Sequence, residues 1–388
     1  MNVGVVLSTL GLVRGGLETI AANLATGLAG RGHQVTVIAG GPQGSDLAPD
    51  FDNLPVRWER APSLPAMSPG WQRLLSRAGQ GRPLEVQSHS FFYACQALPS
   101  IRQLMGELDV SLTFLEIETV KIAAWRQRLG KPNVSYFSGG ISWQWLQRDR
   151  SALRLAISQT IADGYRRRPG FRIDGVVSPG VAEVWLYNEF VVRSAAQTLI
   201  FVGRLEANKG IRELLAIVAA LAEKTPGLEL RLVGDGPLRL EVAAEAQRLA
   251  SRVRIVVLGA LPPDAVRQEL RRADLFVYPS HYESFGIAVL EAMASGLPVV
   301  CSDLPALCEV TGGAACRLPA GDVPAWTAAI SSLLNDPTER RRLSQLGRAT
   351  AGGLTWSRSV EALEVHLQQA VALRSIAERV ETAPPRRP

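Results

Sequence analysis

Residues 275–301 read LFVYPSHYESFGIAVLEAMASGLPVVC, with two short apolar runs on either side of one helical stretch. The pattern predicts a strand over Leu275–Tyr278, a polar turn, a helix over Phe285–Ser295 and a second strand over Pro298–Cys301. Short apolar runs of this kind are typical of strands that are buried on both faces of a parallel sheet. The stretch therefore predicts a β-α-β unit, which is the building block of an α/β fold.

The same alternation extends along the rest of the chain. Apolar strands are expected at Val3–Leu7, Gln34–Ala39, Val110–Leu115, Asn133–Tyr136, Thr198–Val202, Glu229–Val233 and Arg254–Leu258. The rhythm restarts after residues 185–197, so we expect two doubly wound, Rossmann-like sheets, which 388 residues are enough to build. The expected division is an N-terminal domain over 1–190, a C-terminal domain over 191–355, a last helix over 356–380 and a disordered tail over 381–388.

The composition is that of a globular protein, with 47% hydrophobic and 20% charged residues. No stretch approaches the roughly 18 apolar residues that cross a bilayer, and the start Val3–Leu12 has no basic leader, so we expect a cytoplasmic protein. The net charge of +6 is mild, but arginines cluster over Arg148–Arg172, and a basic face can hold nucleic acid, anionic lipid or phosphates. The segment Arg60–Pro83 is either a surface loop or a basic element that touches an acceptor or the inner face of the membrane.

The four cysteines form no CxxC pair, and the four histidines do not cluster. Zinc and a disulfide framework are therefore both disfavoured, and no metal site is predicted. We expect the thiols to be small buried hydrophobic groups. His281 lies beside Glu283 in sequence and is expected either to approach the cleft between the two domains or to have a surface or structural role.

Two carboxylates have seven residues between them, with Glu283 just ahead of the predicted helix and Glu291 within it. If the helix begins near Ser284, Glu291 lies roughly 10 Å beyond Glu283, at about 1.5 Å per residue. The free N–H groups of a helix start can bind a diphosphate, and Gly286 lets the backbone come close to it. A nucleotide sugar laid along this helix would place its hexose at Glu283 and its ribose at Glu291. The alternative is that both glutamates are solvated charges near a helix end.

Residues 203–210 read GRLEANKG and directly follow the apolar strand Leu199–Val202. Arg204 lies at the carboxyl end of that strand, and Lys209 opens the next helix. Two cations at these positions can stabilise a departing diphosphate without a divalent metal. The alternative is a solvated charge cluster at a helix start. The spacing does not fit a Walker loop.

Two glycine-rich turns follow other strands. Residues 11–18 read GLVRGGLE, where Gly15 and Gly16 either let backbone amides approach a ligand or form a plain tight turn. The stretch lacks G-x-G-x-x-G, and the second strand ends without an acid for a ribose, which disfavours a nicotinamide-dependent oxidoreductase. Residues 234–237 read GDGP and are expected to form a turn beside the nucleotide site.

Taken together, these motifs resemble glycosyltransferase family 4, a group of retaining enzymes with the GT-B fold. The segments 203–210, 234–237 and 283–300 follow the family's order and spacing. The resemblance implies that Arg204 and Lys209 bind the donor diphosphate, and that the last helix crosses back onto the first domain. It also implies that Glu283 binds the transferred sugar and Glu291 the ribose. The implied catalytic residues are Arg204, Lys209 and Glu283, and the implied donor site comprises Gly15, Gly16, Gly203, Arg204, Lys209, Gly234, Ser284, Phe285, Gly286 and Glu291.

The first domain departs from the family pattern. Many members carry a histidine in a His-Gly setting near the reacting sugar, where this chain has Ser138 and Gly139. These two residues, together with Glu116 beyond another strand, are the candidates for acceptor contacts. Trp143 and Trp145 either stack on a sugar or pack the domain.

The sequence thus predicts a retaining, metal-independent hexosyltransferase that uses a nucleotide diphosphate sugar, UDP- or GDP-linked, and no other cofactor. The acceptor is left open among a glycan, a lipid-linked molecule and a small molecule. A peripheral membrane contact would suit a lipid-linked acceptor, and no nucleic-acid partner is expected. In a front-face reaction the leaving phosphate takes the acceptor proton, so no dedicated base is required. The alternatives are a catalytically silent GT-B binding subunit and, behind it, an NAD-dependent oxidoreductase.

Overall fold

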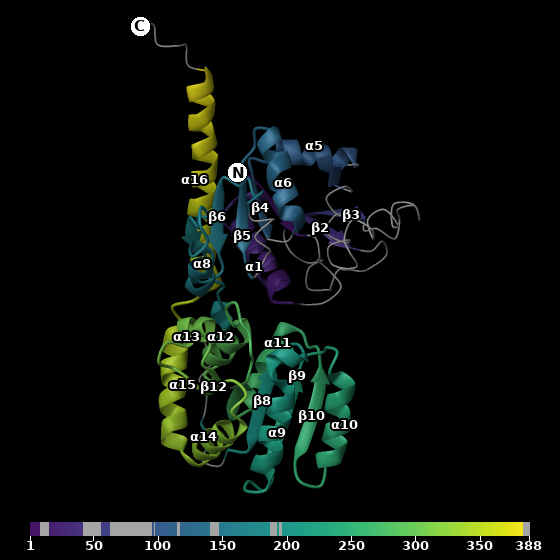
Figure 1. Ribbon diagram of the computed structural model, residues 1–388, viewed down its shortest axis with the longest axis vertical. Coiled ribbons are helices and arrows are strands. Elements are labelled where there is room, and N and C mark those ends of the chain that lie inside the picture. Colours follow the sequence, from purple (N-terminus) through teal and green to yellow (C-terminus); the bar gives the residue numbers. More distant parts are fainter. Residues whose placement is uncertain are drawn as a thin grey trace. The chain divides into compact units, whose positions relative to one another are not determined.

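The computed structural model describes residues 1–7, 15–41, 56–62, 95–96, 98–114, 117–139, 147–186, 192–193 and 196–382. The chain divides into two compact units, each built on its own sheet (Figure 1). Unit 1 comprises residues 1–178 and 356–388, and unit 2 comprises residues 179–355. The chain thus passes between units at 178–179 and 355–356, where the sequence predicts joins at 190–191 and 355–356.

Unit 1 contains a seven-stranded parallel sheet in the order β3-β2-β1-β4-β5-β6-β7. Its strands are β1 (Asn2–Leu7), β2 (Gln34–Gly41), β3 (Arg57–Pro62), β4 (Val110–Phe114), β5 (Asn133–Phe137), β6 (Leu153–Ala156) and β7 (Gly175–Val176). β4 and β5 are buried along their whole length, as in a sheet covered on both faces. The strand order reverses between β1 and β4, which makes this the topological switch point of unit 1.

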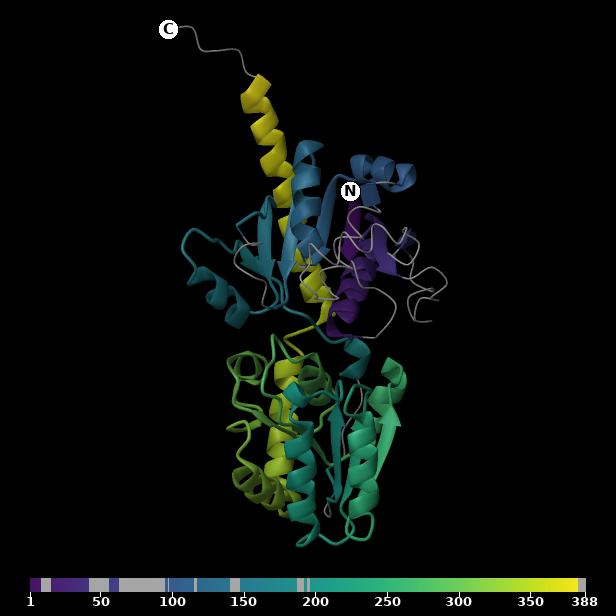
Figure 2. The same ribbon diagram turned by 45° about the vertical axis from the view of Figure 1, so that its right-hand side comes forward.

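Within the described residues, the helices of unit 1 are α1 (Gly16–Gly30), α5 (Pro99–Glu107), α6 (Ile117–Arg128), α8 (Gln159–Arg166) and α16 (Trp356–Thr382). α16 follows unit 2 in sequence but packs along α1 (Figures 1 and 2). A Cβ atom on Gly27 would lie 2.3 Å from Val360 Cγ2, so the glycine lets the two helices approach closely. Beyond this contact, Glu364 pairs with Arg31 at 2.5 Å and with His33 at 2.9 Å. The last helix is thus tied to the first by packing and by charge.

Unit 2 contains a six-stranded parallel sheet in the order β10-β9-β8-β11-β12-β13. Its strands are β8 (Thr198–Val202), β9 (Glu229–Val233), β10 (Arg254–Gly259), β11 (Leu275–Tyr278), β12 (Val299–Ser302) and β13 (Cys316–Leu318). Its helices are α9 (Ile211–Ala222), α10 (Arg239–Leu249), α11 (Pro263–Arg272), α12 (Ile287–Ala294), α13 (Pro305–Thr311), α14 (Val323–Asn335) and α15 (Pro337–Ala351), with short 3-10 turns η2 (Glu183–Trp185) and η3 (Ala207–Lys209). The switch point of unit 2 lies between β8 and β11.

The α/β architecture with two doubly wound sheets is confirmed. α16 continues to Thr382, two residues past the predicted end, and residues 383–388 of the expected tail lie outside the described ranges. Of the segment expected as a loop or membrane contact, Arg60–Pro62 belongs to β3 and residues 63–83 are not described. None of the helices in the described part of the chain has the length and apolar character that crossing a bilayer requires.

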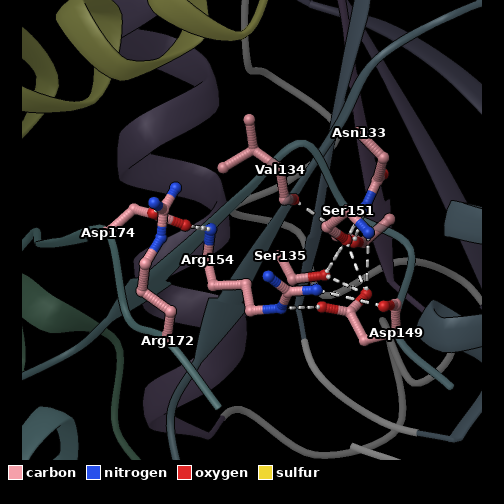
Figure 3. A network of polar contacts seen from close by, with 9 residues as sticks. Asn133, Val134, Ser135, Asp149, Ser151, Arg154, Arg172 and Asp174 are labelled. Atoms are coloured by element: carbon pink, nitrogen blue, oxygen red, sulfur yellow. Dashed lines mark hydrogen bonds and ion pairs between the residues drawn. The ribbon is translucent and has the colours of Figure 1, made fainter. Parts of the chain in front are cut away.

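A buried polar network joins the amino ends of β4, β5 and β6 (Figure 3). The Asn133 side chain accepts from Ser111 Oγ at 2.6 Å and donates to Ser151 Oγ at 2.9 Å. Asp149, whose side chain is fully buried, accepts from Ser151 Oγ at 2.7 Å and pairs with Arg154 Nε at 2.8 Å. Because every one of these groups has a partner, the network fixes the register of the strands at little cost in desolvation.

Replacing Asp149 with asparagine should lower the free energy of unfolding by about 3 kcal/mol, because Arg154 would lose its carboxylate in a buried setting. Chemical denaturation of the whole chain measures this change. Asp163→Asn is the matched control, since Asp163 is half exposed and pairs with Arg166 on the surface at 3.2 Å. The control should change stability by less than about 0.5 kcal/mol. Equal losses in the two variants would contradict a stabilising role for the network.

Candidate active site

Two loops of unit 2 leave the carboxyl ends of neighbouring strands at its switch point. The β8 loop, residues 203–210, follows β8, and the β11 loop, residues 279–286, follows β11. In open parallel sheets this is where ligands bind, because the strand order reverses there and the loops diverge to opposite faces. The two charged motifs predicted from the sequence therefore come from adjacent strands.

The β8 and β11 loops are joined by hydrogen bonds and by close backbone packing. The His281 amide and Ser280 Oγ both donate to the Asn208 carbonyl, at 2.8 and 3.2 Å. Gly210 has φ +69°, and a Cβ atom there would lie 2.0 Å from the Pro279 carbonyl oxygen. Only glycine permits both this backbone conformation and this approach. The two loops consequently form one continuous surface.

Lys209 and Glu283 meet where the two loops touch. Lys209 is the last residue of η3, and its ammonium group pairs with Glu283 Oε1. The Tyr278 hydroxyl, at the end of β11, donates to the same oxygen at 2.6 Å. The Lys209 and Glu283 side chains are 18% and 10% exposed, so the ion pair is largely shielded but still reachable from solvent.

Tyr278 is a phenol held in its neutral form. Burial raises the pKa of Tyr278 well above its usual value, and the negative charges of Glu283 and Glu291 raise it further. Its hydroxyl therefore stays protonated and acts as a hydrogen-bond donor to Glu283.

Arg204 lies on the same loop as Lys209 but stands apart from the Lys209–Glu283 pair. Its guanidinium group is 54% exposed and pairs with Glu206 at 2.5 Å. An exposed pair of this kind is worth little energy, so Arg204 can exchange Glu206 for a stronger anion at small cost. The structure thus brings Lys209 and Glu283 together and leaves Arg204 as a second, exposed cation of the β8 loop.

The helix after the β11 loop begins later than the sequence predicts. α12 starts at Ile287, not near Ser284, because Gly286 adopts a left-handed conformation with φ +106° that interrupts the helix. A Cβ atom on Gly286 would lie 2.6 Å from Leu307 Cδ2, which also favours glycine. Gly286 is also the residue before the helix, so the N-cap position supplies no side chain to the first amides of α12.

The later start changes the place of the flanking residues. Glu291 lies four residues after Ile287, about one helical turn along α12 and not two. Phe285 is only 2% exposed and packs into the core, so any ligand at this position meets its backbone and not its ring. Ser284 is half-buried in the β11 loop.

The glycine-rich turn after β9 packs against the β8 loop. The Gly203 amide donates to the Val233 carbonyl at 2.9 Å, and the Leu205 amide donates to the Asp235 carbonyl at 2.9 Å. A Cβ atom on Gly234, which has φ +134°, would lie 1.9 Å from the Gly203 carbonyl oxygen. The turn therefore sets the path of the loop that carries Arg204 and Lys209.

Gly234→Ala should displace the β8 loop, because alanine at this position combines a strained φ with a backbone overlap. We expect a loss of about 3 kcal/mol or more in the free energy of unfolding, measured by denaturant titration. Gly259→Ala is the matched control: its φ is +73°, but nothing lies within 4 Å of the added Cβ. That variant should lose only about 1 kcal/mol from backbone strain. Similar losses at both positions would show that the Gly203 contact is unimportant.

In unit 1, Gly15 and Gly16 lie at the start of α1, which follows the switch-point strand β1. Gly15 is the residue before the helix and has an extended backbone with φ −116°, so it is not needed there for a left-handed conformation. Gly16 is exposed. As at α12, the residue before the helix is a glycine, so the N-cap position supplies no capping side chain.

The acceptor candidates lie partly outside the described residues. Ser138 and Gly139 follow β5 and are half-buried, and the Tyr165 hydroxyl donates to the Gly139 carbonyl. Glu116, Trp143 and Trp145 are not among the described residues. The structure therefore places Ser138 and Gly139 at the carboxyl end of a strand, and the role of the other three stays a prediction.

The structure also gives the contacts of His281, which the sequence left open, and the burial of the cysteines, which differs in part from the prediction. His281 Nε2 pairs with Glu213 at 2.8 Å near the start of α9. Two of the thiols are buried, but Cys308 and Cys316 are only half-buried, so the expectation of four buried thiols is wrong for these two. Cys308 donates to Asp303 Oδ1 at 3.1 Å.

Tyr278 is the residue of this site that the sequence did not single out. It ends the strand LFVY as an aromatic residue among apolar ones, and it reads as part of the core. The sequence does contain one signal, the hydroxyl of a tyrosine at the carboxyl end of a buried strand. A buried phenol usually finds a hydrogen-bond partner, so this position indicates a polar contact beside the site.

Two family models match the chain, one on each half. The model of Glycosyl transferases group 1 matches residues 189–350, and that of Glycosyltransferase Family 4 matches residues 14–181. Among curated proteins, a glycogen synthase of Mycobacterium tuberculosis is 28% identical over 382 residues, which cover 87% of this chain and 86% of that protein. A D-inositol 3-phosphate glycosyltransferase of Nocardia farcinica is 33% identical over 219 residues, covering 54% and 46%.

Solved structures share the whole fold. A sucrose-phosphate synthase from Thermosynechococcus elongatus has a TM-score of 0.72 at 20% identity and covers 96% of this chain and 99% of its own. HepE of Anabaena, in complex with UDP and glucose, has a TM-score of 0.71 at 17% identity, with 95% and 100% covered. These structures share the GT-B fold of two Rossmann-like units. The two family models and the curated relatives define the enzyme class, the glycosyltransferases. Within that class, the chain belongs to glycosyltransferase family 4.

Proposed function

We propose that this glycosyltransferase transfers a sugar from a nucleotide diphosphate sugar, UDP- or GDP-linked, with retention of the anomeric configuration and without a metal. The observation that carries the proposal is the meeting of Lys209 and Glu283 at the switch point of unit 2, beside the uncapped start of α12. A cation, a carboxylate and the amides of a helix start at one place suit a ligand that contains a diphosphate next to a sugar.

The donor is proposed to lie along the start of α12. Its diphosphate would accept hydrogen bonds from the first amides of the helix and from Lys209, with Arg204 as a second cation. Its sugar would donate hydroxyl hydrogens to Glu283, and its ribose would donate to Glu291 one turn further along the helix. Backbone of Gly203, Gly234, Ser284, Phe285 and Gly286 would line the rest of the site, and a donor contact of Gly15 and Gly16 stays a prediction.

Donor binding exchanges one ion pair for another. In the donor-free protein Lys209 neutralises Glu283, which keeps a shielded carboxylate from standing alone. An arriving diphosphate offers Lys209 a more negative partner, while the sugar hydroxyls offer Glu283 neutral donors. Two cations and a helix start then face a group of about two negative charges, so a divalent metal is not required for charge balance.

The reaction is proposed to proceed on one face of the sugar. The bond from the anomeric carbon to the diphosphate oxygen breaks, and the acceptor oxygen forms its bond on the same face. The acceptor proton passes to the departing phosphate, so the electrons of the broken bond and the proton both leave with the diphosphate. Arg204, Lys209 and the start of α12 stabilise the negative charge that develops there.

The relatives support the donor class but leave the acceptor open. One relative is named a glycogen synthase, another a D-inositol 3-phosphate glycosyltransferase, and HepE was solved with UDP and glucose. We therefore keep a glycan, a lipid-linked molecule and a small molecule as acceptor classes. A cytoplasmic location and a peripheral contact at the inner face of the membrane remain predictions.

The proposal is tested by incubating the purified chain with UDP- and GDP-linked hexoses, with and without EDTA. One donor should raise the melting temperature and slowly release nucleoside diphosphate at the same rate with the chelator present. Proton NMR of a product should show the anomeric configuration of the donor. Release abolished by EDTA would refute metal independence, and an inverted product would refute retention. A chain that binds donors without ever releasing nucleotide would be a silent binding subunit.

A further inference from the structure

The two oxygens of the Glu283 carboxylate have different surroundings. Oε1 receives both the Lys209 ammonium group and the Tyr278 hydroxyl, the latter at 2.6 Å. Oε2 receives none of the hydrogen bonds found among the described residues. Since the side chain is 10% exposed, Oε2 is the oxygen that can meet a ligand. The carboxylate thus has one protein-facing and one ligand-facing oxygen.

The Tyr278 hydroxyl is held in place by its ring. The ring lies 5.4 Å from that of Phe201 and 5.6 Å from that of Phe276, in nearly parallel stacks with interplanar angles of 17° and 19°. Tyr278 is only 3% exposed, so its hydroxyl would be costly to leave unpaired. The stacked strand residues therefore aim a single rigid donor at Glu283.

Lys209 and Tyr278 differ in what they can do once the diphosphate arrives. Lys209 has a flexible four-carbon stem on a loop and is charged, so it can follow the diphosphate. Tyr278 belongs to a buried strand and has no other acceptor than Glu283 among the hydrogen bonds of the described residues. After Lys209 has moved to the diphosphate, the hydrogen bond from Tyr278 remains on Glu283 Oε1.

We propose that Tyr278 is the positioning residue of Glu283: it holds Oε1 so that Oε2 faces the hydroxyls of the transferred sugar after Lys209 has moved to the diphosphate. This role rests on the proposed function of the site as a donor site. It makes Tyr278 a residue that acts on the sugar through Glu283, without touching the donor. Loss of the Tyr278 hydroxyl should therefore lower kcat/KM for the nucleotide sugar and leave the affinity for the nucleoside diphosphate alone nearly unchanged.

Tyr278→Phe tests this role because it removes the hydroxyl and keeps the ring stack. For the donor that the wild-type chain turns over, kcat/KM should fall roughly tenfold or more, as expected for a lost hydrogen bond to a charged group. The dissociation constant of the matching nucleoside diphosphate, measured by calorimetry, should stay within about twofold. The same variant in a Glu283→Gln background should add little further loss, because both changes act through one carboxylate.

Tyr136→Phe is the matched control. Tyr136 is an equally buried phenol, in unit 1, whose hydroxyl donates to the Val177 carbonyl at 2.5 Å. The Tyr136→Phe variant should have a lower melting temperature than the wild type. Its kcat/KM for the nucleotide sugar and its dissociation constant for the nucleoside diphosphate should equal those of the wild type.

The outcomes separate this inference from the function on which it rests. A wild-type chain that turns over no nucleotide sugar would refute the proposed function itself. A wild-type chain that turns over donor, together with a folded Tyr278→Phe variant of unchanged kcat/KM, would overturn the inference alone. Equal losses of affinity for the diphosphate and for the nucleotide sugar would also overturn it, because a general loosening of the site predicts that result.

Discussion

Replacing both Arg204 and Lys209 with alanine should lower turnover of the donor by roughly 10⁴-fold or more. Each cation stabilises negative charge that grows on the departing diphosphate, and removal of one preorganised group of this kind typically costs about 10²- to 10³-fold in rate. Lys209 should matter more for reaching the transition state, because it is shielded, whereas Arg204 is 54% exposed and screened by water. The single variants should therefore differ, with Lys209→Ala the slower enzyme.

Steady-state rates of nucleoside diphosphate release measure this effect. Arg212→Ala is the matched control, since Arg212 lies on α9 close to Lys209 in sequence but pairs with Glu241 on the surface at 2.6 Å. Its rate should equal that of the wild type. Nearly normal turnover by the double variant of Arg204 and Lys209 would contradict the proposal that these two cations stabilise the departing diphosphate.

Glu291→Ala should weaken donor binding about 100-fold. Two ribose hydroxyls donating to one carboxylate are together worth about 3 kcal/mol, which corresponds to roughly two powers of ten in the dissociation constant. Because the ribose is present in the nucleoside diphosphate, that molecule should lose affinity as much as the nucleotide sugar does. This pattern is the opposite of the one expected for Tyr278→Phe.

Calorimetric titration with the nucleoside diphosphate and with its 2′-deoxy form measures the ribose contact. The wild type should bind the deoxy form more weakly, and Glu291→Ala should discriminate less between the two. Glu241→Ala, an exposed carboxylate that pairs with Arg212, is the control and should bind both as the wild type does. Undiminished discrimination in Glu291→Ala would place the ribose elsewhere.

Much of unit 2 could be predicted because its strands are apolar runs that end in glycine or charged residues. β8, β9 and β11 are four or five residues long and mostly buried, and β10 is an apolar run of partly buried residues, so periodicity finds all four. β13, of three residues with a central exposed arginine, is an edge strand and gives no such signal. In unit 1, β3 carries charges at Arg57 and Glu59, and β7 has only two residues, so neither was expected.

Parts of the site depend on contacts that no local pattern contains. The pairing of Lys209 with Glu283 joins residues 74 apart in sequence, and it follows only once the strand order places β8 beside β11. The start of α12 was misplaced because Ser284 is a good helix-start residue, whereas the left-handed Gly286 delays the helix to Ile287. Residue types thus indicated the chemistry, and the sheet topology supplied the geometry.

The most direct measurement is a crystal structure of the chain with its nucleotide sugar. Diphosphate oxygens should then lie about 3 Å from Lys209 Nζ and from the first amides of α12, with sugar hydroxyls on Glu283 Oε2 and the ribose on Glu291. Lys209 should have left Glu283, while Tyr278 still donates to Oε1. A donor seated away from the β8 and β11 loops, with the Lys209–Glu283 pair intact, would contradict the assignment.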